Sequence, residues 1–403
     1  MKYVVVLGDG MADEKIERIG NKTPLQVAKK PYIDALAKKA EVGLCLTVPK
    51  HMSPGSDVAN LSVLGYDPEK YYTGRSPLEA ANIGIDLKDT DMTLRANLIT
   101  VSDDEGYENK TILDYSGGES PTEESRELVK ALKKELDNDF LTLYSGITYR
   151  QCLVVDNGSM NVEFQPPHNI VGEKTGDNMP KGDMADVYAD LLKRSYEILD
   201  KHPINLERVK KGENKANSLW FWGNGKKPLL DSFEGKFNLK GGMISAVDLL
   251  KGIAKLTDME NIEVEGATGT YDTNFIGKAQ KAVEALKNGL DFVYIHMEAP
   301  DECGHHKDLE NKIYSIEQID EKVVKYLVSE LDKLGEDYGI LIMPDHPTPV
   351  RNGKHSGEPV PYLLYRSDKD LSNGANSYDE DEAKKTGAYA PVGHKLIERL
   401  FEK

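Results

Sequence analysis

Cysteine, long apolar runs and positive charge are all scarce in this sequence. Its 403 residues include three cysteines, too few and too scattered for a disulfide framework, which favours a reducing, cytoplasmic compartment. The N-terminal apolar run, residues 3–7, is shorter than the core of a signal peptide, and no stretch approaches the ~18 apolar residues of a membrane helix. We therefore expect a cytoplasmic protein with no membrane partner.

Basic residues are outnumbered, since 51 lysines and arginines face 68 aspartates and glutamates, for a formal net charge of -17. This acid excess argues against non-specific nucleic-acid binding, so no nucleic-acid partner is expected. An anionic substrate would need cations gathered locally against this field. The length suggests two or three domains, and 39% hydrophobic residues can fill a sizeable core. The sequence leaves the oligomeric state open.

Both ends of the chain show the alternation of strands and helices that is typical of an α/β fold. Near the N-terminus, the pattern predicts a strand over 3–7, a helix over 24–40 and a strand over 41–49. This order implies a right-handed crossover and a mostly parallel sheet flanked by helices. The C-terminal half predicts strands over 292–297, 339–343 and 362–365, and helices over 245–256, 274–286, 310–334 and 391–401.

The middle of the chain has a different pattern, of the α+β kind. Strand-like segments alternate over 94–101, 149–155 and 160–165, with amphipathic helices over 123–136 and 184–199 and a polar connector over 201–216. Residues of chemical interest lie on both sides of this region and must meet in one site. We therefore expect a core formed by 1–87 and 213–403, with a smaller domain, 88–212, inserted into it.

Histidines and carboxylates gather in two short phrases near the C-terminal end. Asp301 and His305 follow the strand over 292–297, and Asp345 and His346 follow the strand over 339–343; His355 comes soon after. One such pair would be an ordinary turn. Two pairs at the carboxyl ends of strands that we expect to be adjacent and parallel, with a fifth group nearby, predict a metal site instead. Mixed carboxylate and imidazole ligands suit Mn²⁺, Zn²⁺, Co²⁺ or Fe²⁺ better than Ca²⁺.

Two further residues could join this site. Asp9 ends the first strand in a Gly-Asp-Gly turn; the first strand of a doubly wound sheet lies centrally, so its carboxylate can reach the same edge. Ser56 is expected at the N-cap of a helix over 57–64. Capping alone would explain this serine, but a helix N-terminus also favours a phosphoryl group, and a bound metal would help to deprotonate the hydroxyl.

This ordered set of residues resembles that of the alkaline phosphatase superfamily. The chain is more closely similar to the archaeal-type cofactor-independent phosphoglycerate mutases, whose pattern it follows over nearly its whole length. The resemblance is carried by the phrases VVLGDGMAD, PGSDVANLSVLGYDP, TGRSPLEAA, SLWFWGNGKKP, ISAVDLLKGIAKL, EAPDECGHH, MPDHPTP and HSGEPVP. It implies an alkaline-phosphatase-like α/β core and an inserted α+β cap.

The resemblance also implies a ligand set for two divalent metal ions. One ion would be held by Asp9, Ser56, Asp345 and His346, and the other by Asp301, His305 and His355. His306 is an alternative to its neighbour His305, although the spacing favours His305. Mn²⁺ is the expected metal, with Mg²⁺, Co²⁺ and Zn²⁺ as alternatives.

The activity that the resemblance implies is the interconversion of 3-phosphoglycerate and 2-phosphoglycerate, a step of glycolysis and gluconeogenesis. Ser56 would be the nucleophile and would carry the phosphoryl group as phosphoserine, while a closing cap excludes water. A small phosphorylated hydroxy acid needs cationic partners in so acidic a protein. The candidates are Arg75, Arg95, Arg150 and His168, although each could instead have an ordinary surface or turn role.

Two other activities on the same scaffold stay open. The metal ligands alone cannot separate the mutase from a homoserine-kinase-like phosphotransferase or from a metal-dependent phosphohydrolase. A sulfatase is disfavoured because the nucleophile segment GSDVA lacks the modification motif of that family.

Overall fold

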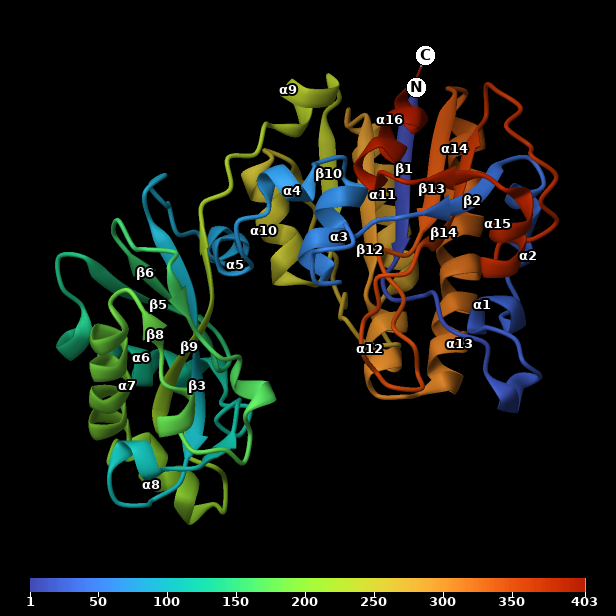
Figure 1. Ribbon diagram of the computed structural model, residues 1–403. Helices are drawn as coiled ribbons and strands as arrows, with labels where there is room; N and C mark the ends of the chain where they lie inside the picture. Colours follow the sequence, from blue (N-terminus) through green and yellow to red (C-terminus); the bar gives the residue numbers. More distant parts are fainter. Residues whose placement is uncertain (403) are drawn as a thin grey trace. The chain divides into compact units, whose positions relative to one another are not determined.

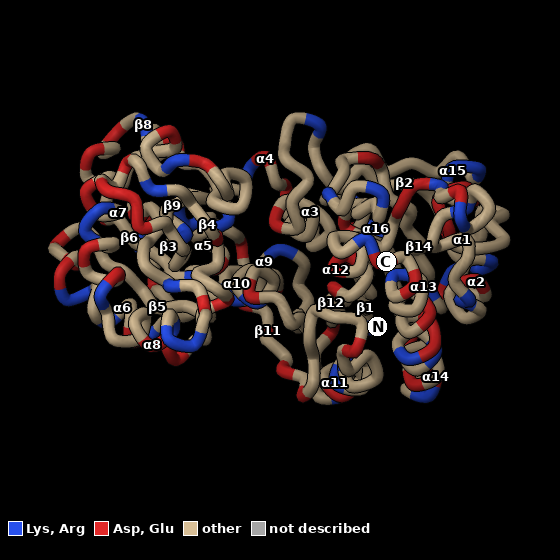
Figure 2. Tube along the Cα trace, turned by 90° about the horizontal axis from the view of Figure 1, so that it is seen from below, with Lys and Arg blue, Asp and Glu red and all other residues tan. Residues whose placement is uncertain are grey.

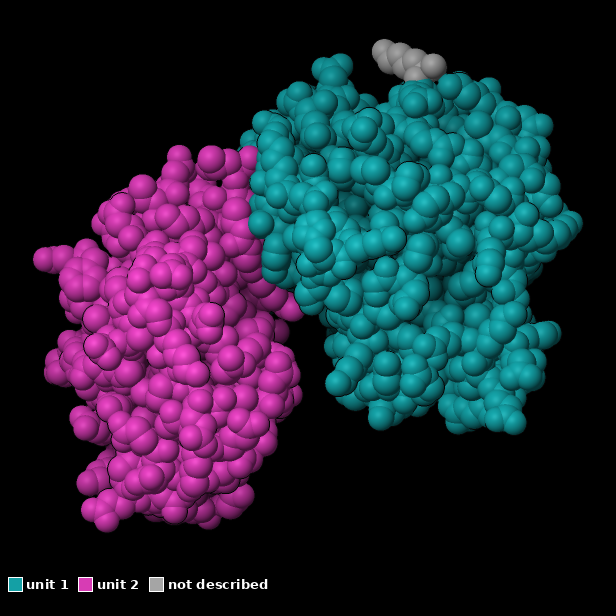
Figure 3. Space-filling view, viewed as in Figure 1, with its two compact units in different colours: residues 1–72, 230–403 teal, residues 73–229 magenta. Residues whose placement is uncertain are grey.

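The computed structural model describes residues 1–402, which form two compact units (Figure 3). Unit 2 is Thr73–Leu229, and unit 1 comprises Met1–Tyr72 and the described chain from Leu230 onward. These borders differ from the expected ones at 87/88 and 212/213. The reason is that β9 (Ser218–Lys226) pairs along β3 (Met92–Val101) and α5 (Ser76–Asn82) packs against both strands.

Unit 1 is built on a sheet that, within the described residues, has eight strands in the order β11-β10-β12-β1-β13-β14-β2-β15 (Figure 1). Pairing is parallel throughout this part of the chain except where β14 meets β13 and β2, so the predicted α/β class with a mostly parallel sheet is confirmed. The strands are β1 (Lys2–Gly8), β2 (Glu41–Cys45), β10 (Gly241–Ile244), β11 (Glu260–Asn261), β12 (Phe292–Met297), β13 (Tyr338–Met343), β14 (Val360–Arg366) and β15 (Tyr389–Ala390).

Strand β1 lies in the middle of this sheet, as expected, but one predicted neighbour relation is wrong. Strands β12 and β13 are not adjacent, because β1 lies between them and pairs with both in parallel. The carboxyl ends of all three strands therefore reach the same edge of the sheet, with β1 at the centre. This order brings Asp9 between the two Asp-His phrases.

The helices of unit 1 differ in detail from the predicted ones. The helix expected over 24–40 is broken at Pro31, because the ring of proline cannot continue the preceding helix. The long helix expected over 310–334 forms, but with a π-helical segment, η5 (Ile319–Val324), between α13 and α14. The helices are α1 (Pro24–Val27), α2 (Pro31–Ala37), α3 (Ser56–Val63), α4 (Pro68–Tyr71), α9 (Phe233–Phe237), α10 (Asp248–Leu256), α11 (Phe275–Lys287), α12 (Ala299–His305), α13 (Leu309–Gln318), α14 (Lys325–Leu334), α15 (Glu380–Thr386) and α16 (Leu396–Phe401).

Strand β1 is buried on both faces. Val4 and Val6 pack in a core with residues of α11, η5 and α14, whereas Tyr3 points to the other face and meets the ring of Phe401 in α16. Because successive residues of a strand alternate between faces, a continuous run of valine and leucine is what a strand covered on both sides requires.

Unit 2 is an α+β unit. Its antiparallel sheet has the strand order β4-β3-β6-β5, and β9 also pairs with β3. The prediction of a polar connector over 201–216 is wrong in part, since Pro203–Lys210 forms the helix α8. This helix begins with a proline, a residue favoured in the first turn. The other elements of unit 2 are β4 (Ile112–Asp114), α6 (Thr122–Leu136), β5 (Leu141–Ile147), β6 (Arg150–Val155), β7 (Val162–Glu163), β8 (Lys181–Gly182) and α7 (Ala185–Leu199).

Acidic and basic positions are scattered along both units (Figure 2). Among the helices of residues 1–402, none is both long and apolar enough to cross a membrane.

A buried ion pair ties α13 to the loops that follow β1 and β13. Lys312 Nζ lies 2.8 Å from Asp13 Oδ2, both side chains are fully buried, and the ammonium also donates to the carbonyl of Thr348 at 2.8 Å. Lys312→Met should lower the free energy of unfolding of unit 1 by about 3–5 kcal/mol, because it leaves a buried carboxylate without its cation. Urea unfolding measures this loss.

The control is the double variant Asp13→Asn with Lys312→Met, which removes both charges and should recover much of the lost stability. Equal losses in the single and double variants would contradict the account.

Candidate active site

The chemically active residues of unit 1 lie at the edge where β1, β12 and β13 end. Asp9 follows β1 directly, and Asp345 and His346 follow β13. Asp301 and His305 follow β12, but not in a loop as expected, because they lie four residues apart on α12. That spacing places both side chains on one side of the helix, with His305 Nε2 3.1 Å from Asp301 Oδ2.

Asp9, Asp345 and His346 form the first group. Each offers a ligand atom within 4.8 Å of the others, and all three are buried. Burial, together with the nearby carboxylates of Asp345 and Asp301, raises the pKa of Asp9 well above its ordinary value. Its Oδ1 atom has no hydrogen-bond partner. Buried carboxylates this close together repel one another, so these residues fit a divalent cation, which would supply the missing positive charge.

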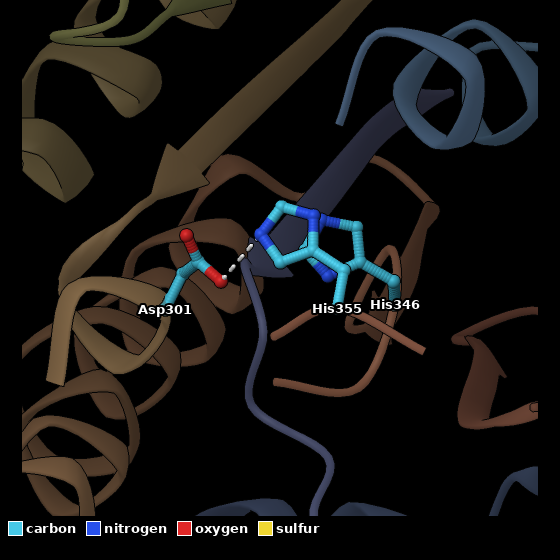
Figure 4. Close-up of side chains that lie close together, drawn as sticks. All are labelled: Asp301, His346 and His355. Carbon is cyan, nitrogen blue, oxygen red and sulfur yellow. Dashed lines mark ion pairs between the residues drawn. The ribbon is translucent and has the colours of Figure 1, made fainter. Parts of the chain in front are cut away.

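Asp301, His346 and His355 form a second group (Figure 4). Each of these residues also offers a ligand atom within 4.8 Å of the others. His355 Nε2 lies 3.4 Å from Asp301 Oδ1, and its ring stacks on that of His346 with centroids 3.8 Å apart. His305 joins them, since its Nε2 is 3.0 Å from His355 Nε2. His306 points elsewhere, 3.9 Å from Glu302, with its side chain 76% exposed.

The protonation of the second group depends on these contacts. Although burial raises the pKa of Asp301, hydrogen bonds from His305 and His355 hold it well below its ordinary value. The same bond to Asp301 raises the pKa of His305 to about 9. Imidazoles packed this closely around one carboxylate form a donor set that suits a borderline divalent cation such as Mn²⁺ or Zn²⁺.

Ser56 belongs to the same place, but it is not the N-cap that the sequence predicts. Gly55 is the N-cap, with φ −92° and ψ 151°, and Ser56 is the first residue of α3. Its Oγ lies 3.1 Å from His346 Nε2, so the hydroxyl faces the carboxylate and imidazole groups. The capping explanation of this serine is therefore wrong, because its side chain bonds across the site instead.

Asn60 is a residue that sequence reasoning missed. It lies one helical turn after Ser56, and its Nδ2 donates to the carbonyl of Ser56 at 2.8 Å and to Asp345 Oδ2 at 2.9 Å. Its Oδ1 accepts from the hydroxyl of Tyr294 at 2.6 Å. This bridge links α3 to Asp345. The spacing of four from Ser56 was the available signal, since it places Asn60 on the same side of the helix.

The four residues expected to bind substrate all belong to unit 2, and the three arginines among them lie near Glu79. Arg75 and Arg95 each place Nε 2.9 Å from a different oxygen of Glu79. The guanidinium of Arg95 also lies over the ring of Trp222, with 4.1 Å from Cζ to the centroid. Trp222 meets the ring of His168 with centroids 5.1 Å apart.

The charged side chains near Glu79 carry a net positive charge. Burial raises the pKa of Glu79, but Arg95 and Arg75, with a smaller contribution from Arg150, hold it below its ordinary value. Burial and then the two arginines Arg95 and Arg75 lower the pKa of His168. Three guanidinium groups around one carboxylate leave a surplus of positive charge, which fits an anionic ligand.

Gly10 provides a test of the geometry at the rim. It has φ +59°, and a Cβ placed there would lie 2.5 Å from Asp301 Oδ1, 2.6 Å from Thr348 Oγ1 and 2.8 Å from Asp301 Cα. Gly10→Ala should therefore displace α12 from β1 and weaken Mn²⁺ binding by about tenfold or more, as altered partners of metal ligands do. Calorimetric titration with Mn²⁺ measures this.

The matched control is Gly20→Ala. Gly20 has φ +77°, so it shares the backbone strain, but nothing lies within 4 Å of the added Cβ. Similar losses of Mn²⁺ affinity in both variants would mean that backbone strain, not contact with Asp301, is responsible.

Comparison with known proteins assigns the family. The sequence profile of the 2,3-bisphosphoglycerate-independent phosphoglycerate mutases matches residues 37–205. A protein of that name from Methanosarcina barkeri is 45% identical over 386 residues, which cover 96% of this chain and 95% of the relative. A solved structure from Pyrococcus horikoshii superposes with a TM-score of 0.83 at 30% identity, covering 99% of this chain and 96% of the other. The cofactor-independent phosphoglycerate mutase of Thermoplasma acidophilum gives 0.65 at 27% identity, with 99% of both chains covered. This chain therefore belongs to the family of 2,3-bisphosphoglycerate-independent phosphoglycerate mutases.

Proposed function

We propose that this protein is an isomerase that interconverts 3-phosphoglycerate and 2-phosphoglycerate in the cytoplasm, without 2,3-bisphosphoglycerate. The observation that carries the proposal is the position of the Ser56 hydroxyl. It lies 3.1 Å from His346, beside the buried carboxylates Asp9 and Asp345, in a chain whose full-length relatives bear the mutase name. A hydroxyl in such a setting is suited to accept a phosphoryl group.

Two divalent metal ions complete this proposal. Asp9, Ser56, Asp345 and His346 would hold one ion, and Asp301, His305 and His355 the other; the buried, unpartnered Oδ1 of Asp9 supports this set. We propose Mn²⁺ as the metal, with Mg²⁺, Co²⁺ and Zn²⁺ as alternatives. When bound, the ions would supply positive charge beside the phosphoryl oxygens and make the serine hydroxyl easier to deprotonate.

Ser56 would exchange one phosphate ester for another. Its hydroxyl loses a proton and Oγ attacks phosphorus; the bond from phosphorus to the C3 oxygen of the substrate breaks, and that oxygen takes up a proton to become the C3 hydroxyl of glycerate. In the return step the C2 hydroxyl loses its proton and its oxygen attacks the phosphoserine; the bond from phosphorus to Oγ breaks, and the Ser56 oxygen takes up a proton. The first turn of α3 favours the charged phosphoryl group, since Ser56 is the first residue of that helix.

The arginine cluster of unit 2 would bind the anionic groups of the substrate. A phosphate and a carboxylate are unfavourable ligands for a protein of net charge -17 unless cations are concentrated locally. Arg75, Arg95 and Arg150 supply that concentration around Glu79. Binding of this kind would also hold glycerate between the two phosphoryl transfers, when water must be kept from the phosphoserine.

The decisive experiment is a ³¹P NMR assay of the Mn²⁺-loaded protein with 3-phosphoglycerate, with no bisphosphoglycerate or nucleotide added. The expected product is 2-phosphoglycerate with little free phosphate, and chelation of the metal should stop the reaction until Mn²⁺ is restored. Free phosphate as the main product would favour a phosphohydrolase. ATP-dependent phosphorylation of homoserine, without mutase turnover, would favour the kinase.

The substitution Ser56→Ala tests whether Ser56 is the nucleophile or only a structural residue. The side chain makes no cap bond, so the variant should fold normally, while kcat falls by about 10³-fold or more. Circular dichroism and the ³¹P assay report the two properties. The control is Ser53→Ala, an exposed serine just before α3, which should keep wild-type turnover. Near-normal turnover of Ser56→Ala would leave another group as the phosphoryl acceptor.

Arg75→Met tests the arginine cluster. Loss of one charged hydrogen bond to substrate, worth about 1.5–3 kcal/mol, should lower kcat/KM by roughly 10- to 100-fold, chiefly through KM. Arg194→Met is the control, because Arg194 belongs to the same unit, has 43% side-chain exposure against 38% for Arg75, and also pairs with a carboxylate four residues away. An unchanged KM in Arg75→Met would remove this residue from the binding site.

A further inference from the structure

His296 is a fully buried histidine outside the seven residues proposed to bind metal. It lies on β12, in register with Leu7 of β1, and its Nε2 is 2.8 Å from Asp9 Oδ2. The other oxygen of Asp9, Oδ1, is buried and has no hydrogen-bond partner. The carboxylate is therefore hydrogen-bonded on one oxygen only, and the other lies 3.6 Å from His346 Nε2.

The position of the ring proton follows from the neighbours of His296. A carboxylate that binds a cation is deprotonated and can only accept a hydrogen bond, so the Nε2 atom must carry the proton. The Nδ1 atom of a neutral ring is then an acceptor. It faces Ser245 Oγ at 3.2 Å, and Ser245 Oγ accepts from the N–H of Val247 at 3.0 Å, which leaves its own hydroxyl proton free for the ring. The bonds thus run in one direction, from Ser245 to His296 to Asp9.

Lys278 fixes the strand that carries this ring. Its side chain is fully buried, and its Nζ donates to the carbonyl of His296 at 2.9 Å. The backbone of His296 is thereby held in place.

We infer that His296 is the positioning residue of Asp9: Ser245 holds its ring as the Nε2–H tautomer, and the ring holds Asp9 with Oδ1 presented to the cation. The inference rests on the proposed binding of a divalent ion by Asp9. Partners of this kind orient carboxylate ligands and commonly change metal affinity by about 10–100-fold when they are removed.

The first test compares two substitutions of His296 by calorimetric titration with Mn²⁺. His296→Phe keeps a ring but removes the donor, so Mn²⁺ affinity should fall by about 10–100-fold. His296→Gln can place an amide N–H near the position of Nε2, so its affinity should stay within a few-fold of wild type. Thermal unfolding of the metal-free variants shows whether each one folds.

The outcomes separate this inference from the proposed function. A wild-type protein that binds no Mn²⁺ would overturn the metal centre and the inference with it. Wild-type binding with unchanged affinity in His296→Phe would overturn the inference alone. Equal weakening in His296→Phe and His296→Gln would also overturn it, because the hydrogen bond would then not be the cause.

The second test reads the tautomer directly. A ¹⁵N NMR spectrum of the Mg²⁺-loaded protein, with the His296 signals identified by their loss in His296→Gln, shows which ring nitrogen carries the proton. The Nε2–H form is expected in wild type, and Ser245→Ala should increase the Nδ1–H form and weaken Mn²⁺ binding less than His296→Phe does. The Nδ1–H form in the metal-loaded wild type would overturn the inference.

Discussion

Three carboxylates, those of Asp9, Asp301 and Asp345, lie buried at one edge of the sheet in a protein that already carries a net charge of -17. Each would be unstable there as an isolated anion, because burial in a poorly polarisable interior penalises charge. The groups that neighbour these carboxylates differ from one carboxylate to the next. Imidazoles contact Asp301, the amide of Asn60 and two backbone N–H groups bond to Asp345, and Asp9 keeps one oxygen without a hydrogen bond. A bound divalent cation, as proposed, would balance these negative charges.

The strands that build this edge could be predicted because their burial is total. Runs such as Tyr3–Leu7 and 292–297 are mostly apolar and buried at every position, as a strand covered on both sides requires. The residues just after these runs were therefore predictable as site residues, since carboxyl ends of parallel strands share one edge. The order β12-β1-β13 was not predictable, because the pairing of β1 depends on contacts with segments 289 and 336 residues further along the chain (Tyr3 with Phe292, Lys2 with Tyr338).

Residues that act by positioning other side chains are difficult to recognise from the sequence. His296 was visible only as one more histidine, and its role appears in the structure because Leu7, directly opposite it, brings β1 and Asp9 within its reach. The expected N-cap position of Ser56 is taken by Gly55, which has no side chain to bond. The border of unit 2 differs from the expected one because β9 pairs with β3 in an antiparallel arrangement that no local pattern reveals.

The division of residues between the two units has a chemical meaning. All seven groups proposed to handle the phosphoryl group belong to unit 1, and all four groups proposed to bind the substrate's anionic groups belong to unit 2. The chain passes between the units at Tyr72–Thr73 and at Leu229–Leu230. Each unit has its own hydrophobic core, so substitutions around Glu79 are expected to leave the bonds that hold Asp9 and Asp345 intact. If the proposed roles hold, the phosphoryl-transfer chemistry and the recognition of the hydroxy acid can therefore change independently of each other.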